Sequence, residues 1–110
     1  MKLPGGDRAV VPLAKLTAYL LSDIHPVGQS KAHVFRSVGF TPATADLLEQ
    51  GMLLLARTEE VVMQVSSLHG TKYVLDGTLA TPRGDPLRLR TVWIIEPGHD
   101  APRFVTAYPR

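Results

Sequence analysis

The chain has 110 residues, of which 45% are hydrophobic, and a formal net charge of +2, as expected for one folded domain over residues 1–110. It contains no cysteine, which excludes disulfides, thiolate zinc sites and cysteine nucleophiles. No apolar run approaches the ~20 residues that cross a membrane. Proline and glycine interrupt the first residues, so we find no export signal and expect a cytoplasmic protein without membrane association.

The first half of the sequence is typical of helices, with apolar residues recurring at a period of 3.6. Ser30 suits an N-cap and Gly39 the residue after a helix, while Thr41 and Pro42 are a strong start signal. Gly51 falls inside the third predicted helix, where it weakens the helix and indicates a close contact. The predicted helices occupy residues 12–22, 30–38 and 41–57.

The second half changes to short segments that are rich in β-branched residues and alternate between apolar and polar positions. Turn residues such as Pro82, Gly84 and Gly98 separate them. Short turns between consecutive strands imply an antiparallel meander. The sequence therefore predicts an α+β fold in which three N-terminal helices pack on a four-stranded antiparallel β-meander. The predicted strands occupy residues 61–68, 72–81, 87–96 and 103–108.

Several short motifs give the chain a resemblance to a known family. The resemblance rests on the segments Leu16-x-x-Tyr19-Leu20-Leu21, His25-Pro26-x-Gly28-x-x-Lys31-Ala32-x-x-Phe35, Gly70-x-x-Tyr73-Val74-x-Asp76, Trp93-Ile94 and Pro102 to Tyr108. On these residues the chain resembles a small bacterial domain family with no assigned function, so the resemblance implies no activity. Gln29 departs from the arginine expected there, which removes a cation beside the candidate site.

The order of the predicted elements carries a more distant resemblance. Helices first, a four-stranded antiparallel sheet second and a final Val-Thr-Ala-Tyr strand are similar to the barnase–EndoU–colicin–RelE group of small ribonucleases. Many of those proteins are toxin domains. This analogy concerns the fold, and a fold alone does not determine a function.

The segment around the predicted second helix is the first candidate for a site. Ser30 and the amides at a helix start would suit a phosphate, and Lys31 would add a full positive charge. His25 titrates near neutrality, as the base of a metal-independent ribonuclease must. The alternative is purely structural: Ser30 caps the helix, Lys31 is solvated, and the ring of His25 packs on the first helix.

The third predicted strand is the second candidate. Arg88 and Arg90 share one face of it, which Val92 and Ile94 continue as apolar residues. Either the end of the sheet extends past the helices, or the arginines line a basic cleft that binds phosphate. If the arginines line a cleft, Thr106 and Tyr108 of the last strand would belong to it, and Tyr73 would add a stacking ring. The alternative is that these residues are present only for their β-propensity.

Asp76 lies in the middle of a predicted strand and needs a partner if it is buried. Arg90 or Arg103 would satisfy it, and that arginine would then serve the structure.

The remaining histidines are weaker candidates. His33 does not share the helix face of Lys31, and His69 and His99 fall in predicted turns. No pair of histidines has ligand spacing, so the sequence predicts neither a metal nor another cofactor.

The leading hypothesis is a small metal-independent ribonuclease-like domain, such as a toxin-type domain, that acts on RNA. His25 would be the base or acid, and Lys31, Arg88 and Arg90 would hold phosphate while Thr106 orients the substrate. One rival is a non-catalytic interaction module, such as a partner or immunity-type protein of a bacterial toxin system, whose arginines meet an acidic protein. Another is a relative of the nucleases that kept the fold and lost the chemistry. The oligomeric state is left open.

Overall fold

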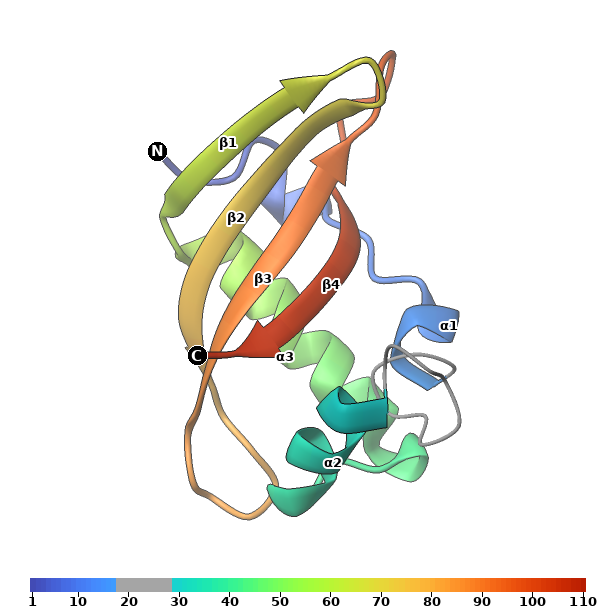
Figure 1. Cartoon of the computed structure of the whole chain (residues 1–110), viewed down its shortest axis with the longest axis vertical. Helices are drawn as coiled ribbons and strands as arrows, with labels where there is room; N and C mark the ends of the chain where they lie inside the picture. Colours follow the sequence, from blue (N-terminus) through green and yellow to red (C-terminus); the bar gives the residue numbers. More distant parts are fainter. Residues whose placement is uncertain (18–28) are drawn as a thin grey trace.

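The computed structural model describes residues 1–17 and 29–110, and side chains for residues 1–17 and 32–110. The described residues form an α+β domain in which a few helices precede a four-stranded antiparallel sheet (Figure 1). The strands follow one another across the sheet in the order β1-β2-β3-β4, which confirms the predicted strand order. Their bounds are Val61–Ser67 for β1, Gly70–Leu79 for β2, Leu87–Ile95 for β3 and Arg103–Pro109 for β4.

The helices agree less closely with the predicted set of three. Of the first predicted helix, the described residues show only α1, Leu13–Lys15. The second is α2, Gln29–Ser37, which starts one residue before the predicted N-cap Ser30 and is followed by Gly39 at φ 103°. The third begins as a 3₁₀ turn, Pro42–Thr44, and continues as α3, Ala45–Thr58. Therefore α3 is the one long helix among the described residues.

The core lies between α3 and one face of the sheet. The apolar side chains of α3 that follow a helical period are buried, and they meet the inward residues of the strands. Trp93 is fully buried and its ring meets Phe104 edge-on at 5.4 Å. The inward α3 residues are Ala45, Leu48, Met52, Leu55 and Ala56.

Two glycines let α3 approach the sheet closely. A Cβ at Gly51 would meet the side chain of Leu79 on β2, and a Cβ at Gly77 would lie 2.7 Å from Leu55 Cδ2 on α3. Each glycine thus makes room for a leucine of the other element. The contact predicted for Gly51 is confirmed, and it fixes α3 against β2 rather than over the whole sheet.

The N-terminal residues connect the two edges of the sheet. Lys2 bridges Glu60 at the start of β1, and Val10 bridges Arg103 at the start of β4. Between them a 3₁₀ turn, Gly6–Arg8, packs against the end of α3, and the chain passes behind the sheet as seen in Figure 1. The opposite side of the sheet stays open, with no helix over it among the described residues.

No helix in residues 1–17 or 29–110 is long and apolar enough to cross a membrane.

Thr91 ties the core to the sheet by polar contacts. It is 1% exposed, its Oγ1 accepts a hydrogen bond from Trp93 Nε1 at 2.9 Å, and it lies 3.4 Å from the carbonyl oxygen of Leu75. Thr91→Val keeps the shape but leaves the buried indole N–H without its acceptor. We expect a loss of about 1–3 kcal/mol in the free energy of unfolding, measured with urea.

Thr78→Val, at an exposed position of β2, is the matched control and should change the stability little. Equal stabilities for the two variants would contradict the role given to Thr91.

Candidate functional site

The candidate site lies on the side of the sheet that faces away from α3, which we call the outer face. Alternation along β3 sends Leu89, Thr91 and Trp93 inward, so Arg88 and Arg90 belong to the outer face. The register places Asp76 of β2 and Tyr108 of β4 directly opposite Arg90, one on each side. One end of the outer face is therefore polar across three strands.

Arg90 and Asp76 form the centre of this region. The guanidinium group donates from Nε to Asp76 Oδ1 at 2.8 Å and from Nη2 to Oδ2 at 3.0 Å, which is a bidentate pair. Both side chains are partly buried, with 26% and 21% of their surface exposed. The predicted pairing of Asp76 with Arg90 is confirmed, whereas Arg103 instead binds Glu96 at 2.9 Å.

Arg110 is a second partner of Asp76, which the sequence did not indicate. Its Nη1 lies 2.7 Å from Asp76 Oδ2, and its backbone N–H donates to the carbonyl oxygen of Arg88. The hydrogen bonds from Arg90 hold the pKa of Asp76 below its ordinary value of 3.8, against the effect of partial burial. The charges of Arg110 and Arg88 also lower that pKa.

Tyr108 extends the polar region to the last strand. The bond to Asp76 raises the pKa of Arg90, and the Tyr108 hydroxyl acts in the same direction. Tyr108 is exposed, and Thr106 lies two residues away on the same face, opposite Val92. The register shifts by one residue between Val92 and Trp93, which leaves Val105 as a bulge and turns Phe104 inward opposite Trp93.

We call Asp76, Arg88, Arg90, Tyr108 and Arg110 the outer-face polar cluster. Three guanidinium groups face one carboxylate there, so the cluster keeps a net positive charge. Arginine presents planar pairs of donors that suit the oxygens of a phosphate or carboxylate. The arrangement can therefore bind an anion, although two nitrogens of Arg90 already bind Asp76.

Tyr73 lies apart from the cluster, contrary to the prediction that it could stack beside it. It pairs with Trp93, points toward the helices and is 8% exposed as a member of the core. The sheet therefore stands between its ring and the cluster, and we leave Tyr73 out of the candidate site. Tyr73 and Asp76 are an odd number of residues apart in the same strand, so the sequence already implied that their side chains point to opposite faces of the sheet.

The structure does not test the roles predicted for the residues before α2 and in its first turn. His25 lies outside the described residues. Ser30 and Lys31 belong to the first turn of α2, and their side chains are not among those described. Their roles stay predictions.

The other three histidines are exposed, His33 on α2 and His69 and His99 in turns. Within residues 1–17 and 29–110 we find no group of three or more His, Asp or Glu side chains that could hold a metal.

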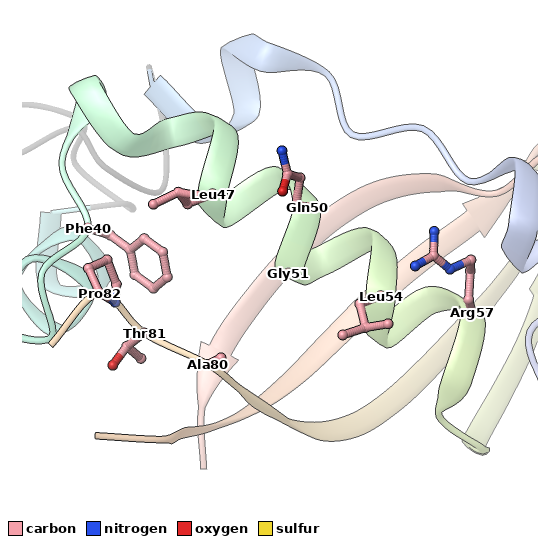
Figure 2. Close-up of a pocket in the computed structure, with 9 residues that line it drawn as sticks. All are labelled: Phe40, Leu47, Gln50, Gly51, Leu54, Arg57, Ala80, Thr81 and Pro82. Carbon is pink, nitrogen blue, oxygen red and sulfur yellow. The ribbon is translucent and has the colours of Figure 1, made fainter. Parts of the chain in front are cut away.

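A groove of about 440 Å³ lies elsewhere, between α3 and the chain that leaves β2 (Figure 2). Leu47, Leu54 and Arg57 come from α3, and Pro82 closes one end beside Phe40. Its walls are mostly apolar. No member of the outer-face polar cluster contributes to it, so the groove and the candidate site are separate features.

The sequence pattern of a domain family of unknown function, DUF6883, matches residues 2–110. The chain belongs to this family. The predicted membership of a family with no assigned function is consistent with this match, whereas the motif signature proposed for that family stays a prediction. The search of the curated proteins found none that matches this DUF6883 domain.

A solved structure shares the fold of this DUF6883 domain. It is described as a contact-dependent growth inhibition toxin–immunity protein complex from Klebsiella pneumoniae 342. One of its chains superposes with a TM-score of 0.76 at 11% identity, covering 96% of this chain and 97% of that chain. At this identity the likeness concerns the fold alone.

The lowered pKa of Asp76 makes stability depend on pH. A carboxylate whose pKa is lower when folded adds stability above its unfolded pKa and loses it as the pH falls through the folded value. We expect Asp76→Asn to be less stable than the wild type at neutral pH. The difference should shrink once the pH falls below 3.8, as measured by urea unfolding across the acid range.

Asp85→Asn, in the exposed turn between β2 and β3, is the control and should show no such gap. A gap for Asp76→Asn that does not vary with pH would argue against an ionised carboxylate at the centre of the cluster.

Proposed function

We propose that this DUF6883 domain is a toxin-type domain that cleaves RNA without a metal, and that the outer-face polar cluster binds the phosphate. The observation that carries the proposal is the surplus of guanidinium groups around Asp76 on an open sheet face. The likeness of the fold to a chain of a toxin–immunity complex supports the biological setting.

The chemistry needs a proton acceptor, a proton donor and positive charge. The 2′-hydroxyl oxygen of the RNA attacks the neighbouring phosphorus, and the bond from phosphorus to the 5′-oxygen breaks. The proton of the hydroxyl passes to a base, and an acid protonates the leaving 5′-oxygen. In the proposal, His25 serves as base or acid, while Lys31 supplies charge from the start of α2.

The cluster supplies the remaining charge, and its members differ in how available they are. Arg88 is exposed, so it can bind a phosphate oxygen directly. Arg90 holds Asp76 with two nitrogens, which fixes the plane of its guanidinium group, and it also bonds the Tyr108 side chain, so only its remaining N–H donors would bind the substrate. Thr106 and Tyr108, on the next strand, would orient the substrate.

A second candidate is the non-catalytic interaction module, for which the outer face also offers an observation. Beside the polar cluster, Met63 and Val65 of β1 are about half exposed and lie on the same face as Val74 and Val92. An apolar area next to arginines suits a protein partner that carries acidic residues at its rim.

The assay that tests the proposal mixes the purified protein with total RNA and labelled tRNA in the presence of a chelator. We expect cleavage by the wild type. His25→Ala should lower the rate ~10²–10⁴-fold, the usual contribution of a general acid or base. Arg88→Ala should also lower it, whereas Arg83→Ala, at an exposed arginine in the β2–β3 turn, should not.

No cleavage by the wild type, or equal cleavage by His25→Ala, would rule out this mechanism. Growth arrest on expression would support a toxin-type role. If the wild type neither cleaves RNA nor arrests growth but binds an acidic protein, and Arg88→Glu abolishes that binding, the interaction module is the correct function.

A further inference from the structure

The free edge of β1 is unusual because nothing in its sequence blocks another strand. The segment from Val61 to Leu68 contains no charged residue and no proline. Its side chains are exposed, with Met63 at 51%, Val65 at 52% and Leu68 at 95%. Edge strands usually carry charges, proline or bulges to prevent pairing with another chain. The one register shift of β1 lies at its start, between Val61 and Met63, so the strand from Met63 onward is a template for pairing.

The opposite edge of the sheet is protected in two ways. Val10 pairs with the start of β4, since its N–H donates to Pro102 and its carbonyl accepts from Phe104 at 2.9 Å. The same strand begins with a charged residue, Arg103, and is followed by another, Arg110. At β1 the N-terminal residues cover only the beginning, where Val61 donates to Met1 and Lys2 bridges Glu60.

The hairpin between β1 and β2 decides which backbone groups point to the free edge. Its two-residue turn is closed by the pair Ser67 and Gly70. In such a hairpin the closing pair is hydrogen-bonded, and alternate residues then point their N–H and carbonyl groups away from the partner strand. Counting back from Ser67, Gln64 and Ser66 direct these groups to the free edge.

We propose that β1 pairs antiparallel with β1 of a second copy of this chain, with the two-fold axis at Gln64. Gln64 then exchanges both backbone hydrogen bonds with Gln64 of the second copy. Residues 63–65 of each copy form the centre of the pair, because Met1 and Lys2 already occupy the edge at residues 60 and 61 and the register of β1 shifts between Val61 and Met63. The two sheets become one continuous sheet.

The side chains favour a second copy over an unrelated partner. In this register Met63 lies opposite Val65 of the second copy, and the symmetry repeats the contact, so two apolar pairs extend the outer face. A segment without charge offers no ionic complement to another protein and no repulsion to an identical strand. The apolar pattern is thus complementary to itself.

Dimerisation of this kind leaves the outer-face polar cluster accessible. The cluster spans β2, β3 and β4, and its member on β2, Asp76, lies farther along that strand than Lys72 and Val74, the partners of Val65 and Met63. The inference therefore does not depend on the proposed function, and either can fail without the other.

A single cysteine tests the register, because the natural chain has none. Opposed residues of a hydrogen-bonded antiparallel pair have Cα atoms ~5.5 Å apart, within the range of a disulfide. We expect Gln64→Cys to form a disulfide-linked dimer under mild oxidation at least ten times faster than Gln50→Cys, an exposed control on α3. Equal rates for the two variants would overturn the proposal.

Paired charges provide a second test by sedimentation. The wild type should show a mass that rises toward that of a dimer with concentration, and Met63→Lys should stay a monomer. Adding Val65→Glu should restore the dimer, because each new lysine then faces the new glutamate of the other copy. Leu54→Lys, an equally exposed position on α3, should behave as the wild type. A wild type that remains a monomer at every concentration would refute the inference.

Discussion

The close packing of α3 on β2 is the constraint on which the rest of the structure depends. Gly51 and Gly77 have no side chains at the points where the two elements meet, so Leu79 and Leu55 fill the space from the opposite sides. A single long helix seated in this way packs on the inner face of the sheet at β2, and together with the N-terminal segment and α2 it closes the core that buries Trp93 and Phe104. The other face is left to solvent, and every candidate site residue that the structure places there owes its exposure to this asymmetry.

On the open face, the same arginine serves structure and candidate function. Asp76 would be costly in the middle of a sheet without a partner, and Arg90 satisfies it with two hydrogen bonds. Because Arg110 satisfies the second carboxylate oxygen as well, the bond to Asp76 does not depend on Arg90 alone. The carboxylate thereby holds the arginines close together in a fixed orientation. A phosphate would then bind to donors that are already ordered.

The strands could be predicted because the signals that mark them lie close together in the sequence. Alternating β-branched residues and strong turn residues mark each strand, and the bounds found for β1, β3 and β4 lie within one residue of those predicted. The helical half depends more on tertiary contacts, so the 3₁₀ turn before α3 and the brief α1 were not foreseen.

Only part of the candidate site could be predicted from the sequence, because the rest depends on how the strands are paired. Arg88 and Arg90 share a face by simple alternation, and the need of Asp76 for an arginine follows from the cost of burial. Arg110 reaches Asp76 only because the register of β4 brings the end of that strand beside β3, and no local pattern reveals a register. The bulge at Val105 is equally invisible in the sequence, although without it Phe104 would not turn inward opposite Trp93 in this register.

The two ends of the open face differ in the kind of contact they suit, and this difference bears on function. Around Arg90 the surface is charged and ordered by hydrogen bonds, as binding of an anion requires. Around Met63 and Val65 the strand β1 is apolar, carries no charge of its own and has a free edge, as association with another strand requires, although Lys72 of β2 lies opposite Val65. A single chain can use both, because Met63 and Val65 pair with the first half of β2, whereas the cluster begins at Asp76 farther along that strand. What the arginine end binds, RNA or an acidic protein, then distinguishes a nuclease from an interaction module. The β1 end determines only the number of copies in the assembly.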